Sequence, residues 1–299
     1  MMPTGVPQVE ISDCPLSIVI PAKNEAFSLR SLLPRLATLM PQAEIIVVND
    51  GSSDDTVEIC KVCGVRVVSH PYSKGNGAAI KTGARAATRD RLLFMDADGQ
   101  HRPEDISLLL EKMAEGYDMV VGARTMQSQA GVHRGLANGL YNRLASWMVG
   151  QRVADLTSGF RAIDAQKFRQ FNYLLPNGFS YPTTITMSFF RAGYSVAYVA
   201  ILAPKRIGKS HVRLAKDGIR FLLIIFKIGS LYSPLKLFAP VALVHGLLGF
   251  GYYLFTYLTQ NRLSSMSVFL FTAAVTIFMI GLVSEQITAL MYKDSSDRE

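Results

Sequence analysis

Two long apolar stretches near the C-terminus limit what this chain of 299 residues can fold into. Residues 237–259 contain no Asp, Glu, Lys or Arg, and residues 266–292 contain only Glu285 among these four types. A helix of about 20 residues crosses the roughly 30 Å of hydrocarbon in a bilayer. The stretches therefore predict two transmembrane helices. Two buried core helices are the alternative, which fits their uninterrupted length less well.

Basic residues next to these stretches predict on which side of the membrane the rest of the chain lies. Eight Lys and Arg residues fall between 205 and 236, whereas the connection between the two stretches offers only Arg262. Because basic residues favour the cytoplasmic side, we expect a cytoplasmic N-terminal domain. The first apolar stretch, 16–20, is too short for a signal peptide, and three cysteines suit a reducing compartment.

The net charge of +8 raises the question of nucleic acid as a partner. Basic residues concentrate beside the membrane stretches, where anionic lipid headgroups attract them, and no alternation of basic and aromatic residues suggests single-strand binding. Membrane lipids or a phosphorylated substrate are therefore the expected partners, and nucleic acid is not.

The first 120 residues alternate short β-branched runs with amphipathic stretches, which predicts a mostly parallel sheet covered by helices. The expected strands are 16–20, 44–48, 65–69, 91–95 and 118–121, with a later one at 194–202. The expected helices are 26–39, 54–63, 77–88 and 103–115. An amphipathic segment after residue 213 predicts an interfacial helix. The resulting division is 1–213, a catalytic domain; 214–233, the interfacial helix; and 234–299, the transmembrane region.

Polar residues follow three of the expected strands. The string MDADGQH places Asp96 and Asp98 at the end of one strand, while PAKNE at 21–25 and VVNDGSSDDT at 47–56 end two others. Open α/β sheets bind ligands at this edge, and paired carboxylates suit Mg²⁺ or Mn²⁺ beside a nucleotide diphosphate. Each string alone also reads as a solvated turn or a helix cap. Their succession favours a nucleotide site.

Together with HPYSKGNGAA at 70–79 and DLTSGFRAID at 155–164, these strings resemble glycosyltransferase family 2. Within it, the chain is similar to dolichol-phosphate mannose synthases and bacterial polyprenyl-phosphate relatives with two C-terminal spans. The resemblance implies a GT-A (Rossmann-like) domain, a nucleotide-sugar donor, a polyprenyl-phosphate acceptor and a Mg²⁺ or Mn²⁺ cofactor. It also implies an integral protein of the bacterial inner (plasma) membrane and a possible homo-oligomer, as tetramers occur among bacterial relatives.

The resemblance also implies roles for individual residues. The donor pocket comprises Pro21, Lys23, Glu25, Val48, Asp50, Ala97 and Asp98, and the metal site comprises Asp96, Asp98 and Gln100. Asp50 is expected to read the base, and Lys23 replaces a tyrosine common in relatives. Asp98, Arg124 and Asp155 are the catalytic candidates. Because a lipid phosphate is already largely ionised near neutral pH, Asp155 is assigned to positioning first and to general base second.

The acceptor phosphate is expected to meet basic side chains. The candidates are Arg124, Arg134, Lys205, Arg206, Lys209 and His211. Residues 203–210 also read A-x-x-x-x-G-K-S, a relaxed phosphate-loop pattern, but the loop opens without glycine and no acidic strand follows it. Sugar transfer to lipid phosphate, with inversion at the anomeric carbon, is the leading hypothesis. A processive polysaccharide synthase and an inactive membrane scaffold are the alternatives.

Overall fold

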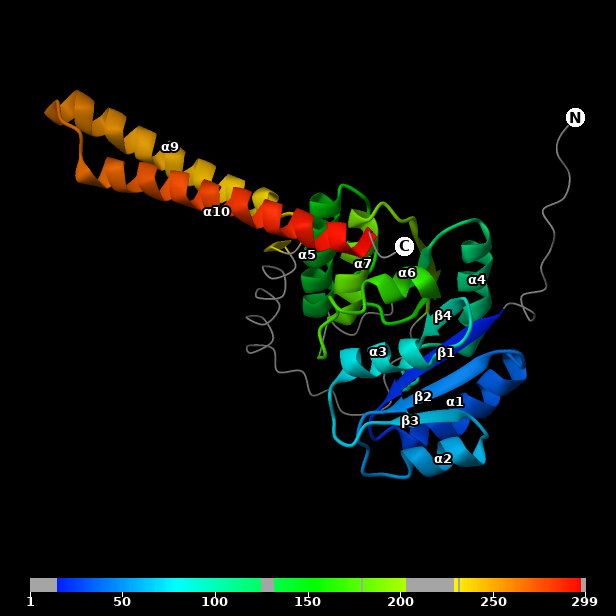
Figure 1. Cartoon of the computed structure of the whole chain (residues 1–299). Coiled ribbons are helices and arrows are strands. Elements are labelled where there is room, and N and C mark those ends of the chain that lie inside the picture. Colours follow the sequence, from blue (N-terminus) through cyan, green and yellow to red (C-terminus); the bar gives the residue numbers. More distant parts are fainter. Residues whose placement is uncertain (1–14, 125–131, 179, 203–228, 231, 297–299) are drawn as a thin grey trace, which may run out of the picture. The chain divides into compact units, whose positions relative to one another are not determined.

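The computed structural model of the chain describes residues 15–124, 132–178, 180–202, 229, 230 and 232–296. Side chains are described except in the first turns of one helix, residues 132–138, and beyond residue 290. The chain divides into two compact units, Met1–His211 and Val212–Glu299 (Figure 1). Each unit is considered by itself.

The first unit is built on a seven-stranded sheet with the order β3-β2-β1-β4-β6-β5-β7. Its strands are β1 Leu16–Ala22, β2 Glu44–Asn49, β3 Arg66–Ser69, β4 Arg91–Phe94, β5 Met119–Arg124, β6 Arg161–Asp164 and β7 Val196–Ile201. Only β6 runs antiparallel to its neighbours, β4 and β5. All other neighbouring strands are parallel, so the predicted α/β class is confirmed.

Helices cover both faces of this sheet. They are α1 Ala26–Leu39, α2 Thr56–Val62, α3 Asn76–Ala86, α4 Ile106–Ala114, α5 Val132–Val149, α6 Ala165–Gln170 and α7 Tyr181–Arg191, with a 3₁₀ turn, η2 Pro103–Asp105, before α4. Side chains alternate between the faces of a strand. Accordingly Ile18 joins the buried cluster of α1 and α4, whereas its neighbour Val19 lies against Gly83 of α3.

Four elements between residues 124 and 192 have no counterpart among the predicted ones. Strand β6 is only four residues long and begins and ends with charged residues, Arg161 and Asp164. Helix α7 carries three threonines and two phenylalanines in eleven residues, a composition typical of strands. Helices α5 and α6 were missed as well. Local pattern fails here because tertiary packing decides the structure of these segments.

The second unit contains two long apolar helices, α9 Pro234–Gln260 and α10 Ser265–Ser296. Their candidate spans have mean hydropathies of 1.6 and 2.4, and only 11% of each is buried, unlike the core helices of a soluble domain. Glycines permit close packing: a Cβ on Gly281 would lie 2.8 Å from Cβ of Phe238. The expected interfacial helix, 214–233, falls largely outside the described residues.

Candidate active site at the carboxyl edge of the sheet

The ends of β1 and β2 lie side by side at the carboxyl edge of the sheet. Pro21 pairs with Val48 in the parallel register, and the amide of Asp50 donates to the carbonyl of Ala22 at 2.9 Å. Three residues predicted to form the donor pocket are thus neighbours. Lys23 is exposed and Glu25 is half-buried on the loop that follows β1.

Hydrogen bonds join the loops after these two strands. Asn24 adopts a φ of 56°. Its side-chain Oδ1 accepts from the backbone amide of Ser53 at 2.8 Å, and its backbone amide donates to Oγ of Ser52 at 3.0 Å. Asp54 accepts from the amide of Ala26 at 3.0 Å, at the start of α1. The strings PAKNE and VVNDGSSDDT therefore form one polar rim, a pairing that their separation in the sequence conceals.

The carboxylate of Asp50 is buried and accepts four hydrogen bonds from the segment 70–75. The donors are Nδ1 of His70 at 2.7 Å, Oγ of Ser73 at 2.8 Å, and the amides of Lys74 and Gly75 at 2.7 and 2.9 Å. Burial opposes ionisation, but these hydrogen bonds outweigh it and lower the pKa of Asp50 to about 2. Asp50 therefore fixes the segment 70–75. Its contact with a base remains a prediction.

This arrangement predicts that Asp50→Asn destabilises the protein in a pH-dependent way. The depressed pKa of Asp50 contributes about 2 kcal/mol above the unfolded pKa, near 4, and this contribution is lost as the pH falls through about 2. Thermal melting of the detergent-solubilised chain should show a gap between variant and wild type at pH 6 that shrinks below about pH 4. The exposed Asp55→Asn is the control, and an equal, pH-independent gap for both variants would contradict the assignment.

The N-terminus of α3 is closed by the protein itself. The amides of Gly77 and Ala78 donate to the carbonyls of Gly178 and Asn177 at 3.2 and 2.9 Å. A Cβ on Gly77 would lie 2.0 Å from the carbonyl oxygen of Pro176, so glycine is required for this approach. Helix N-termini otherwise attract phosphates. In this structure these two amides of α3 are already bonded to protein carbonyls.

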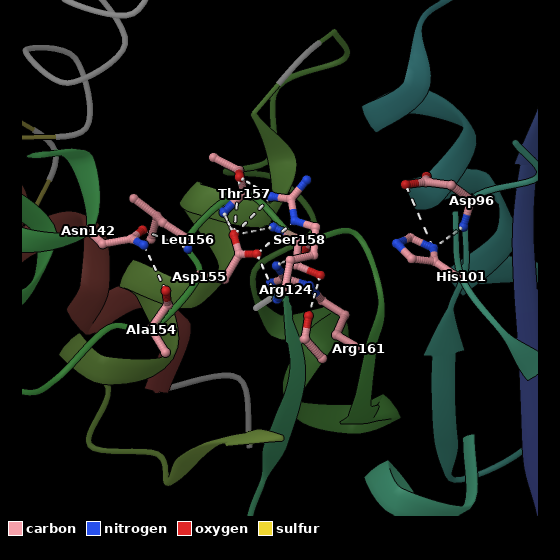
Figure 2. Close-up of polar contacts among 11 residues, drawn as sticks. Asp96, His101, Arg124, Asn142, Ala154, Asp155, Leu156, Thr157, Ser158 and Arg161 are labelled. Carbon is pink, nitrogen blue, oxygen red and sulfur yellow. Dashed lines mark hydrogen bonds and ion pairs between the residues drawn. The ribbon is translucent and has the colours of Figure 1, made fainter. Parts of the chain in front are cut away.

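The two carboxylates of the string MDADGQH lie just beyond β4. Asp98 accepts from the amide of Gln100 at 3.2 Å, which closes a turn through Gly99 at φ 75°. The amide of Asp96 donates to Nδ1 of His101 at 3.0 Å, as Figure 2 shows. Asp96 and Asp98 therefore lie beyond the carboxyl end of β4, where the sequence places them, and the roles expected of them and of Ala97 and Gln100 stay predictions.

His101 is a site residue that the sequence analysis missed. Its ring is buried and stacks on Phe160 with centroids 5.0 Å apart. Burial lowers the pKa of His101 to about 4, so the neutral imidazole accepts the bond from Asp96 at physiological pH. The sequence shows a histidine in a polar turn, and only the fold reveals its burial.

The oxygen atoms of this turn fit a divalent cation. Two carboxylates and an amide oxygen are the hard ligands that Mg²⁺ and Mn²⁺ prefer. Among the described residues, no three His, Cys, Asp or Glu side chains gather into a metal cluster. A Mg²⁺ site commonly combines one or two carboxylates with substrate phosphates. Asp96, Asp98 and Gln100 therefore suit an ion shared with a diphosphate.

Arg124 and Asp155, two of the catalytic candidates, form an ion pair. Nε and Nη2 of Arg124 donate to the two carboxylate oxygens of Asp155 at 2.8 and 3.0 Å, and Nη2 also reaches Oγ1 of Thr157 at 2.6 Å (Figure 2). Burial opposes ionisation of Asp155, but the arginine and nearby amides hold its pKa below the usual range. Such a carboxylate is a weak base, which favours positioning over proton abstraction.

The loop that carries Asp155 is attached to α5 through Asn142. Nδ2 of Asn142 donates to the carbonyl of Ala154 at 2.7 Å, and its Oδ1 accepts from the amide of Leu156 at 3.0 Å (Figure 2). This anchor had no signal in the sequence. The remaining acceptor candidates, Lys205, Arg206, Lys209 and His211, lie outside the described residues, as does the side chain of Arg134.

Two family models match the chain. Glycosyl transferase family 2 covers residues 17–172, and the GtrB C-terminal hairpin covers residues 233–290. The first includes the polar rim, the turn at Asp96 and Asp98, and Asp155. The second coincides with the two apolar helices, and the combination indicates membrane association.

Relatives with similar sequences carry names of lipid-phosphate sugar transferases. The undecaprenyl-phosphate 4-deoxy-4-formamido-L-arabinose transferase of Klebsiella pneumoniae is 38% identical over 49% of this chain, which spans only about half (48%) of that relative. The undecaprenyl-phosphate mannosyltransferase of Micrococcus luteus is 30% identical over 64% of this chain and 85% of its own length.

Among solved structures, glucosyl-3-phosphoglycerate synthase of Mycobacterium tuberculosis, in complex with Mn²⁺, UDP and glucosyl-3-phosphoglycerate, shares the fold. Its TM-score is 0.59 at 23% identity, with 76% of this chain and 86% of that chain covered.

Proposed function

Because the chain belongs to glycosyltransferase family 2, we propose that it transfers a sugar from a nucleotide-diphosphate sugar to a polyprenyl phosphate at a membrane surface. One observation carries the proposal. The polar rim, the turn at Asp96 and Asp98, and the Arg124–Asp155 pair meet at one edge of the sheet, in a chain that continues into two apolar helices. The names of the relatives supply the chemical class of the acceptor.

The donor would lie along the carboxyl edge. Its base and ribose would meet the rim formed by Pro21, Lys23, Glu25, Val48 and Asp50. Its diphosphate would reach Asp96, Asp98 and Gln100, with Ala97 between the two carboxylates. A bound Mg²⁺ or Mn²⁺ would neutralise charge on the departing diphosphate.

The reaction is a single displacement with inversion. A phosphate oxygen of the lipid forms the new bond to the anomeric carbon, and the bond from that carbon to the diphosphate breaks. The phosphate is already ionised, so no proton has to be removed. Asp155 orients Arg124, and Arg124 with the basic candidates Arg134, Lys205, Arg206, Lys209 and His211 holds the acceptor. Catalysis then rests on alignment and charge stabilisation.

The location follows from the same proposal. The two apolar helices would cross the bacterial inner membrane, with residues 1–213 on the cytoplasmic side and residues 214–233 at the interface. The basic residues between 205 and 236 support this orientation.

Membranes containing the full chain, polyprenyl phosphate and a panel of labelled UDP- and GDP-sugars test the proposal. We expect label in the lipid fraction with one or a few donors, complete loss with EDTA, and recovery with Mn²⁺ or Mg²⁺. Polyprenol without phosphate is the control acceptor and should receive no label. Growth of a polysaccharide independent of lipid phosphate would favour a processive synthase, and absence of donor binding would favour an inactive scaffold.

A further inference from the structure

Gly159, in the string DLTSGFR, lies directly against the carboxylate of Asp96. A Cβ at position 159 would stand 2.8 Å from Oδ2 of Asp96 and 3.3 Å from its Cγ and Oδ1. Gly159 is not among the glycines with positive φ, so its backbone does not demand glycine. A side chain at position 159 would instead have to displace the neighbouring carboxylate. Asp96 thus has His101 at its amide and the bare backbone of Gly159 beside its side chain.

Two buried side chains hold the main chain on which Gly159 sits. Oη of Tyr181 donates to the carbonyl of Gly159 at 3.1 Å, and Nη2 of Arg161 donates to the carbonyl of Ser158. The hydroxyl of Ser158 donates in turn to the carbonyl of Gly122 at 2.6 Å. Cζ of Arg161 lies 5.8 Å from the centroid of the Tyr181 ring, so these two side chains also contact each other.

Arg161 is unusual because its guanidinium is fully buried and has no ion-pair partner within the part of the chain that the structure describes. It donates to the carbonyl of Pro182 at 3.1 Å and to Oγ1 of Thr186 at 3.0 Å, and its Nε has no partner among the described residues. Burying an unpaired charge is costly. The carboxylates that feel this charge are Asp155 and Asp96. A purely structural role would be served more cheaply by an apolar side chain.

We propose that Gly159, held by Arg161 and Tyr181, is a positioning unit that seats the carboxylate of Asp96 for the diphosphate-bound cation. The unit links the string DLTSGFR, which carries Asp155, to the turn that carries Asp96 and Asp98, so that one segment of backbone supports both. This inference rests on the proposed function, because only there is Asp96 assigned to the cation. The contact between Gly159 and Asp96 itself does not depend on that assignment.

A thermal double-mutant cycle on the full chain tests the contact without metal. Gly159→Ala should lower the melting temperature by about 3 °C, and should do so much less in an Asp96→Ala background, where the carboxylate is gone. Gly83→Ala is the matched control, since its Cβ would stand 2.2 Å from Cγ1 of Val19. It should lower the melting temperature equally in both backgrounds. An equal cost of Gly159→Ala in both backgrounds would overturn the inference.

Binding of Mn²⁺ in the presence of UDP, or in parallel GDP, tests the consequence, with the free-ion electron paramagnetic resonance signal as readout. Gly159→Ala should weaken Mn²⁺ affinity roughly 10- to 100-fold, and Tyr181→Phe about fivefold. Gly281→Ala, a variant in the second unit whose Cβ would stand 2.8 Å from Cβ of Phe238, should leave it unchanged. So should Tyr194→Phe, which loses a comparable hydrogen bond, 2.7 Å to Gln170. Wild-type affinity in Gly159→Ala would overturn the positioning role. If the wild type itself bound no Mn²⁺, the proposed metal site would fail, while the thermal cycle would still decide whether Gly159 seats Asp96.

Discussion

Asp98→Ala should reduce the turnover of sugar transfer roughly 100- to 1,000-fold, because the departing diphosphate would lose much of its charge stabilisation. Asp98 is half-buried on a turn at the end of β4, and its Oδ1 already accepts from the amide of Gln100. The turn therefore presents the carboxylate in a fixed place. Initial rates with the donor identified in the panel, at saturating Mn²⁺, measure the effect.

A matched control lies at the other end of the same strand. Asp90 is exposed and immediately precedes β4, far from the carboxyl edge, so Asp90→Ala should retain wild-type turnover. Asp98→Asn should resemble Asp98→Ala, because the amide keeps the size but lacks the charge. Near-normal turnover in Asp98→Ala, with the protein folded, would remove Asp98 from the metal site.

Asp155→Ala should both stop transfer and destabilise the protein by about 3 kcal/mol. The variant leaves the guanidinium of Arg124 without its bidentate partner in a largely buried position. Because the pKa of Asp155 is lowered in the folded state, its contribution is present above the unfolded pKa, near 4, and is lost as the pH falls further. The difference in melting temperature between the wild type and Asp155→Ala should therefore be large at pH 7 and smaller below pH 4.

The double variant Arg124→Ala/Asp155→Ala separates the cost of leaving a buried charge unpaired from the cost of losing side-chain packing. Removing both partners leaves no unpaired ion, so we expect the double variant to be more stable than the sum of the single losses predicts. The exposed pair Arg35–Glu104 is the control, and Glu104→Ala should cost about 1 kcal/mol or less. Equal losses for Asp155→Ala and Glu104→Ala would contradict the buried-pair assignment.

Sequence pattern predicted six of the seven strands of the sheet and missed only β6. β1, β2 and β4 are buried on both faces, so their sequences are unbroken and the polar residues that end them stand out. β6 and α7 were missed because their buried faces carry polar residues, and Arg161 of β6 finds its partners, the carbonyl of Pro182 and Oγ1 of Thr186, on α7. Local propensity contains no information about such partners.

The same distinction applies to the candidate site. The positions of Asp96 and Asp98 followed from the end of a strand, and Asp155 from a resembling string. The four donors to Asp50, the burial of His101 and the contact of Gly159 with Asp96 depend on segments 20 to 63 positions apart coming together. The sequence identifies a candidate carboxylate, whereas its pKa and its hydrogen-bond partners depend on the fold.

The reversed direction of β6 explains how two distant strings reach one site. Parallel neighbours end at the carboxyl edge, but an antiparallel strand begins there, so residues just before Arg161 arrive beside the end of β4 without a long loop. Arg161 pairs with Phe94, and a slip of one residue would turn its side chain to the opposite face of the sheet and carry Gly159 away from Asp96. An insertion or deletion between Ser158 and Arg161 would therefore move Gly159 away from Asp96. Related chains with the same sheet should therefore differ between Ser158 and Arg161 by substitutions only, whereas insertions and deletions should occur in other loops.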